Sequence, residues 1–127
     1  MPYKILYIED NTHNRVLVKR VLEAENYLVI EAENGVEGIL KAENEQPDLI
    51  IIDINLPDID GYEVTKQLRQ MPVTAKTPIL AMTANVIHAD LEKTLTVGCN
   101  GYIRKPINID LLPKQIAQYI WDQRKQI

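Results

Sequence analysis

The sequence predicts a doubly wound α/β fold with a five-stranded parallel sheet. Short apolar runs alternate along the chain with longer segments in which apolar residues recur at helical spacing. Elements that alternate in this way form a parallel sheet with right-handed crossovers and helices on both faces. The run 49–52 is continuous, apolar and rich in β-branched residues, as expected of a strand that is covered on both faces.

The expected strands are short and each ends at a polar or turn-forming segment. They comprise residues 5–8, 28–30, 49–52, 78–82 and 101–103. The expected helices lie between them, with one more at the end of the chain. They comprise a helix that runs to about residue 26, a helix over 35–45, a helix after the turn 57–61, and helices over 86–95 and 110–123.

Apolar residues and prolines set the details of these helices. In the first helix the apolar positions are Val16, Leu17, Val21 and Leu22, and in the second Val36, Ile39 and Leu40 share one face. Pro47 marks the end of the second helix. Pro113 is compatible with the last helix only in its first turn, where the missing N–H has no partner to lose.

Size and composition indicate one domain over residues 1–127, with 46% hydrophobic and 25% charged residues. The net charge of −4 and the pI near 5.2 disfavour direct nucleic-acid binding. Cys99 is the only cysteine, which fits a reducing compartment. The beginning of the chain has no secretion signal and no apolar run could cross a membrane, so we expect a soluble cytoplasmic protein without membrane contacts.

Polar side chains follow four of the predicted strands. Glu9 and Asp10 follow the first strand, Asp53 the third, Thr83 the fourth and Lys105 the fifth. In doubly wound sheets, ligands bind beyond the carboxyl ends of the strands, near the point where the strand order reverses. These five residues therefore define the predicted site.

Three of the predicted site residues are carboxylates. If Glu9, Asp10 and Asp53 converge, each pair of like charges about 4 Å apart costs roughly 1 kcal/mol in water and about 4 kcal/mol near a protein surface. Lys105 contributes one positive charge, which does not offset three negative ones. A hard divalent cation with oxygen ligands, such as Mg²⁺, would neutralise the remainder.

Asp53 is the best candidate nucleophile, because it ends the most buried strand and is held by a rigid scaffold. Phosphoryl transfer requires positioning and neutralisation of charge more than covalent chemistry from the protein. Mg²⁺ and Lys105 can each stabilise phosphoryl oxygens, and the Thr83 hydroxyl can donate to a third. Asn55 lies two residues beyond Asp53, where its backbone carbonyl could join the metal ligands.

Four motifs carry a resemblance to a known family. They are ILYIEDN (5–11), LIIIDINLPDIDGYEV (49–64), ILAMTAN (79–85) and GYIRKPI (101–107). With these motifs in this order, the sequence resembles the receiver domain of two-component response regulators over essentially all of its length. The resemblance implies a flavodoxin-like (βα)5 three-layer sandwich with strand order 2-1-3-4-5, and a response regulator acting in phosphorelay signal transduction.

The resemblance also implies roles for the site residues. Asp53 would be the phosphoacceptor, receiving a phosphoryl group from a phosphohistidine on a sensor histidine kinase or phosphotransfer protein. Glu9, through water, would organise Mg²⁺ together with Asp10, Asp53 and the carbonyl of Asn55. Thr83 and Lys105 would contact the phosphoryl group, and the peptide bond between Lys105 and Pro106 would be cis.

The same resemblance implies how the signal leaves the site. Thr83 would shift toward the phosphoryl group and Tyr102 would swing inward, which alters the face formed by the fourth helix, the fifth strand and the fifth helix. Asn55 and Asn85 are amides at positions that tune the lifetime of the phosphoryl group. Neither is a general base, so we expect self-dephosphorylation that is neither very fast nor negligible.

Simpler structural roles compete with several of these assignments. Glu9 and Asp10 could form a helix N-cap, Lys105 could be a solvated surface lysine, and Tyr102 could be a half-buried strand residue. His13 is expected to face solvent. His88 is also expected at the surface and Cys99 in the core, whereas Trp121 fits either the edge of the core or a partner surface.

The sequence is compatible with three classes of function, namely a signalling receiver, a phosphohydrolase and a flavin carrier. A stand-alone signalling protein, with an unidentified downstream protein partner and a monomeric or weakly dimeric state, is favoured over a receiver fragment of a larger regulator or hybrid kinase. An aspartate-nucleophile phosphohydrolase is disfavoured because Asn55 replaces the acid/base carboxylate that turnover needs. A flavin carrier of the same architecture is disfavoured because the loop 9–14 is acidic.

Overall fold

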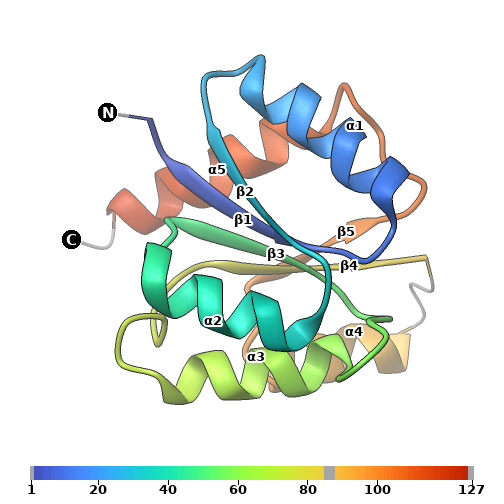
Figure 1. The fold of residues 1–127 in the computed structure, drawn as a ribbon, viewed down its shortest axis with the longest axis vertical. Coiled ribbons are helices and arrows are strands. Elements are labelled where there is room, and N and C mark those ends of the chain that lie inside the picture. Colours follow the sequence, from blue (N-terminus) through green and yellow to red (C-terminus); the bar gives the residue numbers. More distant parts are fainter. Residues whose placement is uncertain (1, 85–87, 126–127) are drawn as a thin grey trace.

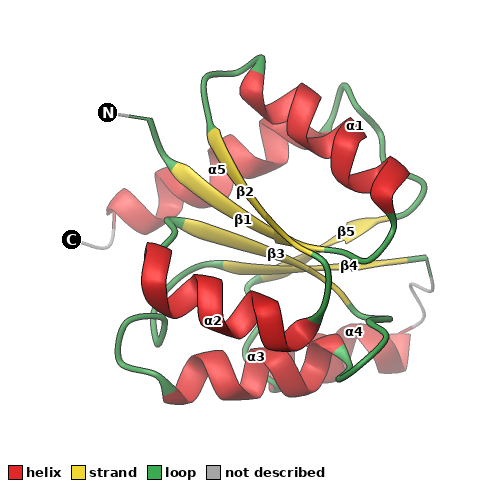
Figure 2. Cartoon of the chain, viewed as in Figure 1, coloured by secondary structure: helices red, strands yellow, loops and turns green. Residues whose placement is uncertain are grey.

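A computed structural model describes residues 2–84 and 88–125 of the chain. In this part of the chain, five strands alternate with five helices (Figures 1 and 2). The elements are β1 Lys4–Ile8, α1 Thr12–Glu23, β2 Leu28–Ala32, α2 Gly35–Glu45, β3 Leu49–Asp53, α3 Gly61–Gln70, β4 Ile79–Thr83, α4 His88–Thr96, β5 Gly101–Arg104 and α5 Leu112–Lys125.

The strands form one parallel sheet in the order β2-β1-β3-β4-β5, which confirms the expected topology. Helices α1 and α5 cover one face, and α2, α3 and α4 cover the other, so the molecule has three layers (Figure 1). The chain leaves β1 toward β2 on one side and later enters β3 on the other side. The strand order therefore reverses between β1 and β3, where such folds bind ligands.

Two apolar clusters fill the space between the sheet and its helices. In β1, Ile5 and Tyr7 belong to the cluster under α1 and α5, whereas Leu6 and Ile8 belong to the opposite cluster. This alternation follows from the two-residue period of a strand. All residues of β3 are buried, as the uninterrupted apolar run predicted. The last of them is Asp53, so the sheet itself carries this side chain to the site.

The buried face of helix α1 matches its predicted apolar positions only in part, because Leu22 is buried and Val21 packs against the core. Arg15, Val18 and Leu22 are its buried residues, whereas Val16 is 43% exposed. The helix also ends at Glu23 and not near residue 26. Arg15 can be buried because its guanidinium donates hydrogen bonds to nearby oxygens, which an apolar pattern does not register.

Helix α2 has the predicted bounds, but of its predicted apolar face only Ile39 packs against the core. Val36 and Leu40 are each 56% exposed, and the residues that face the sheet are small ones. At Gly38 an added Cβ would lie 2.5 Å from Cδ1 of Ile8. The close approach of α2 to β1 therefore selects glycine here, and the side chains of Val36 and Leu40 point to solvent.

The remaining boundaries agree with the sequence to within two residues. Pro113 lies in the first turn of α5, as required, and Pro47 follows the left-handed residue that caps α2. Helix α5 begins and ends two residues later than expected. The predicted start of the fourth helix at Val86 lies outside the described residues.

Candidate functional site

Glu9 is the first residue after β1, and it is completely buried. Its backbone N–H donates to the carbonyl of Ala32 at 2.9 Å, which extends the pairing of β1 with β2. Its side chain lies on the face that carries Tyr7, two residues earlier. Glu9 does not cap α1; the N-cap is Asn11, whose side-chain oxygen accepts from the N–H of Asn14 at 2.9 Å.

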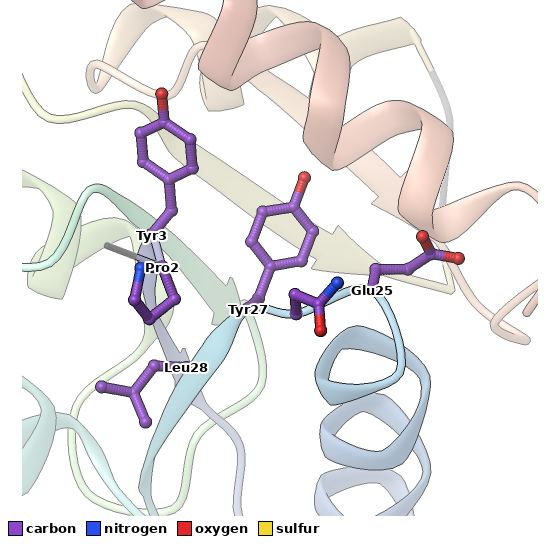
Figure 3. A pocket seen from close by; sticks show the side chains of 6 residues that line it. Pro2, Tyr3, Glu25, Tyr27 and Leu28 are labelled. Atoms are coloured by element: carbon purple, nitrogen blue, oxygen red, sulfur yellow. The ribbon is translucent and has the colours of Figure 1, made fainter.

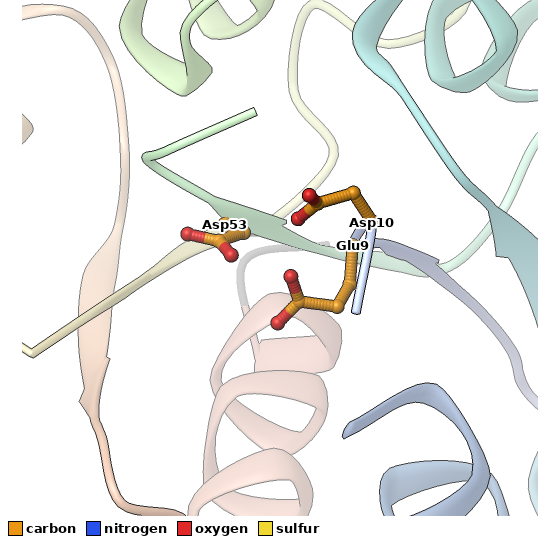
Figure 4. Close-up of side chains that lie close together, drawn as sticks. All are labelled: Glu9, Asp10 and Asp53. Carbon is orange, nitrogen blue, oxygen red and sulfur yellow. The ribbon is translucent and has the colours of Figure 1, made fainter. Parts of the chain in front are cut away.

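The three predicted carboxylates come together at the carboxyl edge of the sheet. Ligand oxygens of Glu9, Asp10 and Asp53 all lie within 4.8 Å of one another. Figure 4 shows them approaching from the ends of β1 and β3. Asp10 is exposed, whereas Glu9 and Asp53 are buried. The cluster thus has a buried side and an open side, through which a ligand from solvent can reach it.

Asp53 is held on both of its carboxylate oxygens. Oδ1 accepts the backbone N–H of Asn55 at 2.9 Å, and Oδ2 accepts Nζ of Lys105 at 2.8 Å. The start of α3 packs closely behind it, because a Cβ on Gly61 would lie 2.7 Å from the Asp53 carbonyl oxygen. These contacts fix the orientation of a carboxylate that is 2% exposed. The metal-binding role of the Asn55 carbonyl stays a prediction.

Lys105 bridges two of the carboxylates. Its Nζ lies 2.8 Å from Oδ2 of Asp53 and 3.2 Å from Oε1 of Glu9, and its side chain is 22% exposed. It follows β5, where its N–H donates to the Thr83 carbonyl at 2.9 Å, and the Lys105–Pro106 peptide is cis, as the family resemblance implied. Lys105 is therefore a partly buried ion-pair partner and not a solvated surface lysine.

The electrostatics of the cluster favour a divalent cation. Burial raises the pKa of Glu9, the neighbouring Asp53 raises it further, and Lys105 opposes both. Burial lowers the pKa of Lys105, but the hydrogen bond and charge of Asp53 and the charge of Glu9 outweigh it and leave that pKa raised. One ammonium beside three carboxylates leaves an excess of negative charge in a set of oxygen ligands. This combination fits Mg²⁺.

Thr83 and Tyr102 lie where the sequence placed them. Thr83 ends β4 and is 9% exposed, and the preceding residue, Met82, pairs with Asp53 across the sheet. Tyr102 lies on β5 and is half-buried, with its ring packed against the apolar cluster under α2, α3 and α4. It also lines a hollow between β5 and α5, together with Arg104 and Pro106.

Three residues around Glu9 escaped the sequence analysis. The hydroxyl of Tyr7 donates to Glu9 Oε1 at 3.1 Å, Asn14 Nδ2 donates to the same oxygen at 3.2 Å, and Arg15 donates to the Glu9 carbonyl at 2.6 Å. Tyr7 and Glu9 are two residues apart at the end of a strand, so they share a face. That spacing was a usable signal, whereas the contacts from α1 depend on how the helix packs.

The remaining residues named from the sequence do not belong to the acidic cluster. His13 is exposed and Cys99 is buried, as expected, and burial raises the pKa of the Cys99 thiol. Trp121 is 54% exposed, a position that fits either the edge of the core or a partner surface. Asn85 and the side chain of His88 lie outside the described residues.

The most voluminous of the described hollows is at the opposite edge of the sheet. It measures about 710 Å³ and is lined by Pro2, Tyr3, Glu25, Asn26, Tyr27 and Leu28. Figure 3 shows the two tyrosine rings side by side in it. Glu25 is the one charged residue in this described lining, so the hollow lacks the converging charges found at the carboxyl edge.

The fold and the site define a doubly wound α/β protein with a cluster of three carboxylates and a lysine at its switch point. Residues 5–117 match the model of the response regulator receiver domain. The polar-differentiation response regulator DivK of Brucella anthropi is 37% identical over 122 residues, which cover 96% of this chain and 99% of DivK. DivK of Brucella ovis is 35% identical over the same length.

Solved structures agree with this match. A CheY-like receiver domain protein from Methanospirillum hungatei superposes with a TM-score of 0.93 at 29% identity, covering 100% of both chains. The receiver domain of a sensor histidine kinase from Pseudomonas aeruginosa has a TM-score of 0.87 at 32% identity, covering 94% of this chain and 98% of that one. That structure has a magnesium ion coordinated in its active-site cleft.

The chain belongs to the response regulator receiver domain family of two-component signalling. Receiver domains are phosphorylation-dependent signalling switches and not classical enzymes. They bind Mg²⁺ in an acidic active site and interact with histidine kinases or phosphotransfer proteins. Within the described residues, every helix is too short or too polar to cross a bilayer.

Proposed function

We propose that this receiver domain, over residues 1–127, accepts a phosphoryl group on Asp53 and changes its partner contacts in response. One observation carries the proposal. The Asp53 carboxylate is held at the strand-order reversal between the Lys105 ammonium and the carboxylates of Glu9 and Asp10. A nucleophile placed between a fixed cation and a set of metal ligands meets the two requirements of phosphoryl transfer, position and neutralisation.

Each residue has a defined part in this transfer. A carboxylate oxygen of Asp53 bonds to phosphorus as the P–N bond of the donor's phosphohistidine breaks, and the imidazole leaves. Lys105 and the Thr83 hydroxyl stabilise phosphoryl oxygens. Glu9, Asp10, Asp53 and the Asn55 carbonyl would hold Mg²⁺, which neutralises charge on the transferred group when bound.

The switch itself is assigned to Thr83 and Tyr102. Phosphorylation gives Thr83 a charged acceptor, and Tyr102 moves inward from its half-buried position on β5, where it pairs with Ala81 of β4. The face formed by α4, β5 and α5 then changes shape, and this face contacts a downstream protein. Because Asn55 and Asn85 offer no general base to water, the domain dephosphorylates itself slowly, and not within a few seconds.

The partners follow from the family. The phosphoryl donor is a sensor histidine kinase or a histidine phosphotransfer protein, and the output is protein contact in the cytoplasm by a monomer or weak dimer. DivK relatives are matched over 99% of their own length. A regulator that acts through this domain itself is therefore the favoured form, with a receiver inside a larger regulator or hybrid kinase as the alternative.

The test is incubation with acetyl phosphate and MgCl2, followed by intact mass spectrometry. We expect one labile phosphoryl group per chain. This group should not be added when Mg²⁺ is omitted or in the Asp53→Asn variant. Asp58→Asn is the matched control, because Asp58 caps α2 through the N–H groups of Gly35 and Val36 and lies outside the acidic cluster. Continuous phosphate release over many turnovers would instead identify a hydrolase.

A further inference from the structure

We propose that Tyr7 and Asn14 are positioning residues that hold one oxygen of Glu9, so that its other oxygen is free for Mg²⁺ or a water bound to it. This inference rests on the proposed function, because it concerns the same cluster of carboxylates. It assigns two residues that lie outside the set of metal ligands and phosphoryl contacts described above.

Tyr7 brings a hydroxyl into the core of the protein. The residue is fully buried in β1, pairs with Ile51 of β3, and belongs to the apolar cluster under α1 and α5. Its neighbours in β1, Leu6 and Ile8, are aliphatic. An aliphatic side chain would serve packing here without the cost of burying a polar group. Packing alone therefore does not account for the hydroxyl, which requires a hydrogen-bond partner.

Two acceptors lie within reach of the Tyr7 hydroxyl. They are Oε1 of Glu9 at 3.1 Å and Sδ of Met82 at 3.3 Å. A phenol has one proton to donate, and a carboxylate is a far stronger acceptor than a thioether.

This pairing restrains Glu9. If the carboxylate turned away, the fully buried hydroxyl would be left with a weak sulfur acceptor, which is unfavourable. Tyr7 thus favours the orientation in which Glu9 lies beside Asp53. Since Tyr7 is fixed by the sheet, this orientation exists before any ligand binds.

The donors around Glu9 are distributed unequally over its two oxygens. Oε1 accepts from Tyr7, from Asn14 Nδ2 at 3.2 Å and from Lys105 Nζ at 3.2 Å. Among the hydrogen bonds of the described residues, Oε2 accepts one, a long bond of 3.4 Å from the N–H of Asn11. A carboxylate oxygen has about two lone pairs, so Oε1 is saturated and Oε2 retains capacity for a ligand.

Lys105 differs from the other two donors because it also binds Asp53. A phosphoryl group on Asp53 gives Lys105 a new acceptor. Lys105 can then give up its contact with Glu9. Tyr7 and Asn14 have no such second task among the described contacts of the site, so they keep Oε1 in place when Lys105 moves. Residues that orient a metal-binding carboxylate in this way typically change metal affinity 10- to 100-fold when removed.

The test is calorimetric titration of the protein with MgCl2 alone. Tyr7→Phe keeps the ring, and we expect its Mg²⁺ dissociation constant to be about tenfold weaker than that of the unsubstituted protein. Asn14→Ala, at a half-buried position of α1, provides a second variant with an expected loss of about threefold or more. Tyr27→Phe is the matched control, because this tyrosine is half-buried at the opposite edge of the sheet, and its affinity should be unchanged.

A double-mutant cycle with Glu9→Gln separates the positioning of Glu9 from a general effect of Tyr7→Phe on the fold. In the Glu9→Gln background, Tyr7→Phe should change the Mg²⁺ dissociation constant by less than about twofold, because the carboxylate that it positions is gone. Equal Mg²⁺ binding by the unsubstituted protein, Tyr7→Phe and Asn14→Ala would overturn this inference and leave the proposed function intact. A loss that persists in the Glu9→Gln background would also overturn it. No Mg²⁺ binding by the unsubstituted protein would overturn the proposed function itself.

Discussion

The two edges of the sheet differ in the side chains that they bring together. At the amino edge, two half-buried tyrosines and one exposed glutamate line a hollow of about 710 Å³. At the carboxyl edge, three carboxylates and a lysine converge, and two of the carboxylates are buried. The concentration of opposed charges in a partly buried place, and not the size of a cavity, marks the functional site of this protein.

The edges also differ in how their lysines are held. Lys4 at the amino edge lies 3.7 Å from Glu45, and both side chains are more than 40% exposed. Lys105 at the carboxyl edge contacts two carboxylates that are at most 3% exposed. An exposed pair contributes little to stability because water screens it, whereas removing one partner of a buried pair leaves an uncompensated charge. We therefore expect the loss of Lys105 to reduce the stability of the protein more than the loss of Lys4.

The largest expected effect sharpens this comparison. Lys105→Ala should lower the free energy of unfolding at pH 7 by about 3 kcal/mol, because Glu9 and Asp53 lose their cation. Lys4→Ala should lower it by less than about 1 kcal/mol. Urea denaturation in EDTA measures both. Adding MgCl2 should recover more stability in Lys105→Ala than in the unsubstituted protein, and equal losses for the two lysines would contradict the account.

The second effect concerns the backbone behind Asp53. Gly61→Ala should lower the free energy of unfolding by about 2–3 kcal/mol, because its Cβ would meet the Asp53 carbonyl and Cα of Ile54, at 2.7 and 2.8 Å. Gly38→Ala should cost about 1 kcal/mol, since its Cβ meets the side chain of Ile8, which can move. Thermal denaturation of the two variants gives the order, and a more stable Gly61→Ala would be incompatible with the packing described.

The third effect is a pH dependence that belongs to the carboxyl edge. Burial and Asp53 raise the pKa of Glu9 in the folded protein above its ordinary value of 4.5. The folded state therefore binds more protons than the unfolded state between these two pKa values, and the free energy of unfolding decreases as pH rises through that window.

Glu9→Gln isolates this dependence. Without Mg²⁺, the stability of the unsubstituted protein relative to Glu9→Gln should fall as pH increases from 4.5 upward, as measured by urea denaturation at successive pH values. Saturating MgCl2 should oppose the fall, because the metal favours the ionised carboxylate. A relative stability that increases with pH in the absence of metal would show that Glu9 is not buried as described.

The smallest effect is expected on the outward face of α2. Leu40→Gln should change the free energy of unfolding by less than about 0.5 kcal/mol, because Leu40 is 56% exposed. Leu68→Gln in α3 is the contrasting variant, since that side chain is fully buried and its loss should cost several times more. A large loss at residue 40 would mean that α2 packs on the face its apolar residues suggested.

Much of the fold could be predicted because it depends on local signals. The apolar run of β3 and the order of strands and helices indicated the parallel sheet, and the strand ends then identified Glu9, Asp10, Asp53, Thr83 and Lys105. Parallel strands bring their carboxyl ends to one edge, so the convergence of the carboxylates needed no knowledge of side-chain packing.

The rest depended on contacts between elements. The apolar residues of α1 and α2 indicated the buried faces only in part, because Arg15 is satisfied by hydrogen bonds and Gly38 permits close approach. Tyr7 looked like an ordinary core residue within an apolar run. Its two-residue spacing from Glu9 indicated a shared face, but the hydrogen bond between its hydroxyl and Glu9 depends on side-chain conformations that the spacing does not determine.

The most direct test of the account is to identify the residue that carries the phosphoryl group. After incubation with acetyl phosphate and MgCl2, borohydride reduces an acyl phosphate on an aspartate to homoserine, which peptide mass spectrometry can locate. The account predicts homoserine at position 53 alone, and none in Asp53→Asn. Homoserine at Asp10, Asp48 or Asp58 in the unsubstituted protein, or none at any position, would contradict it.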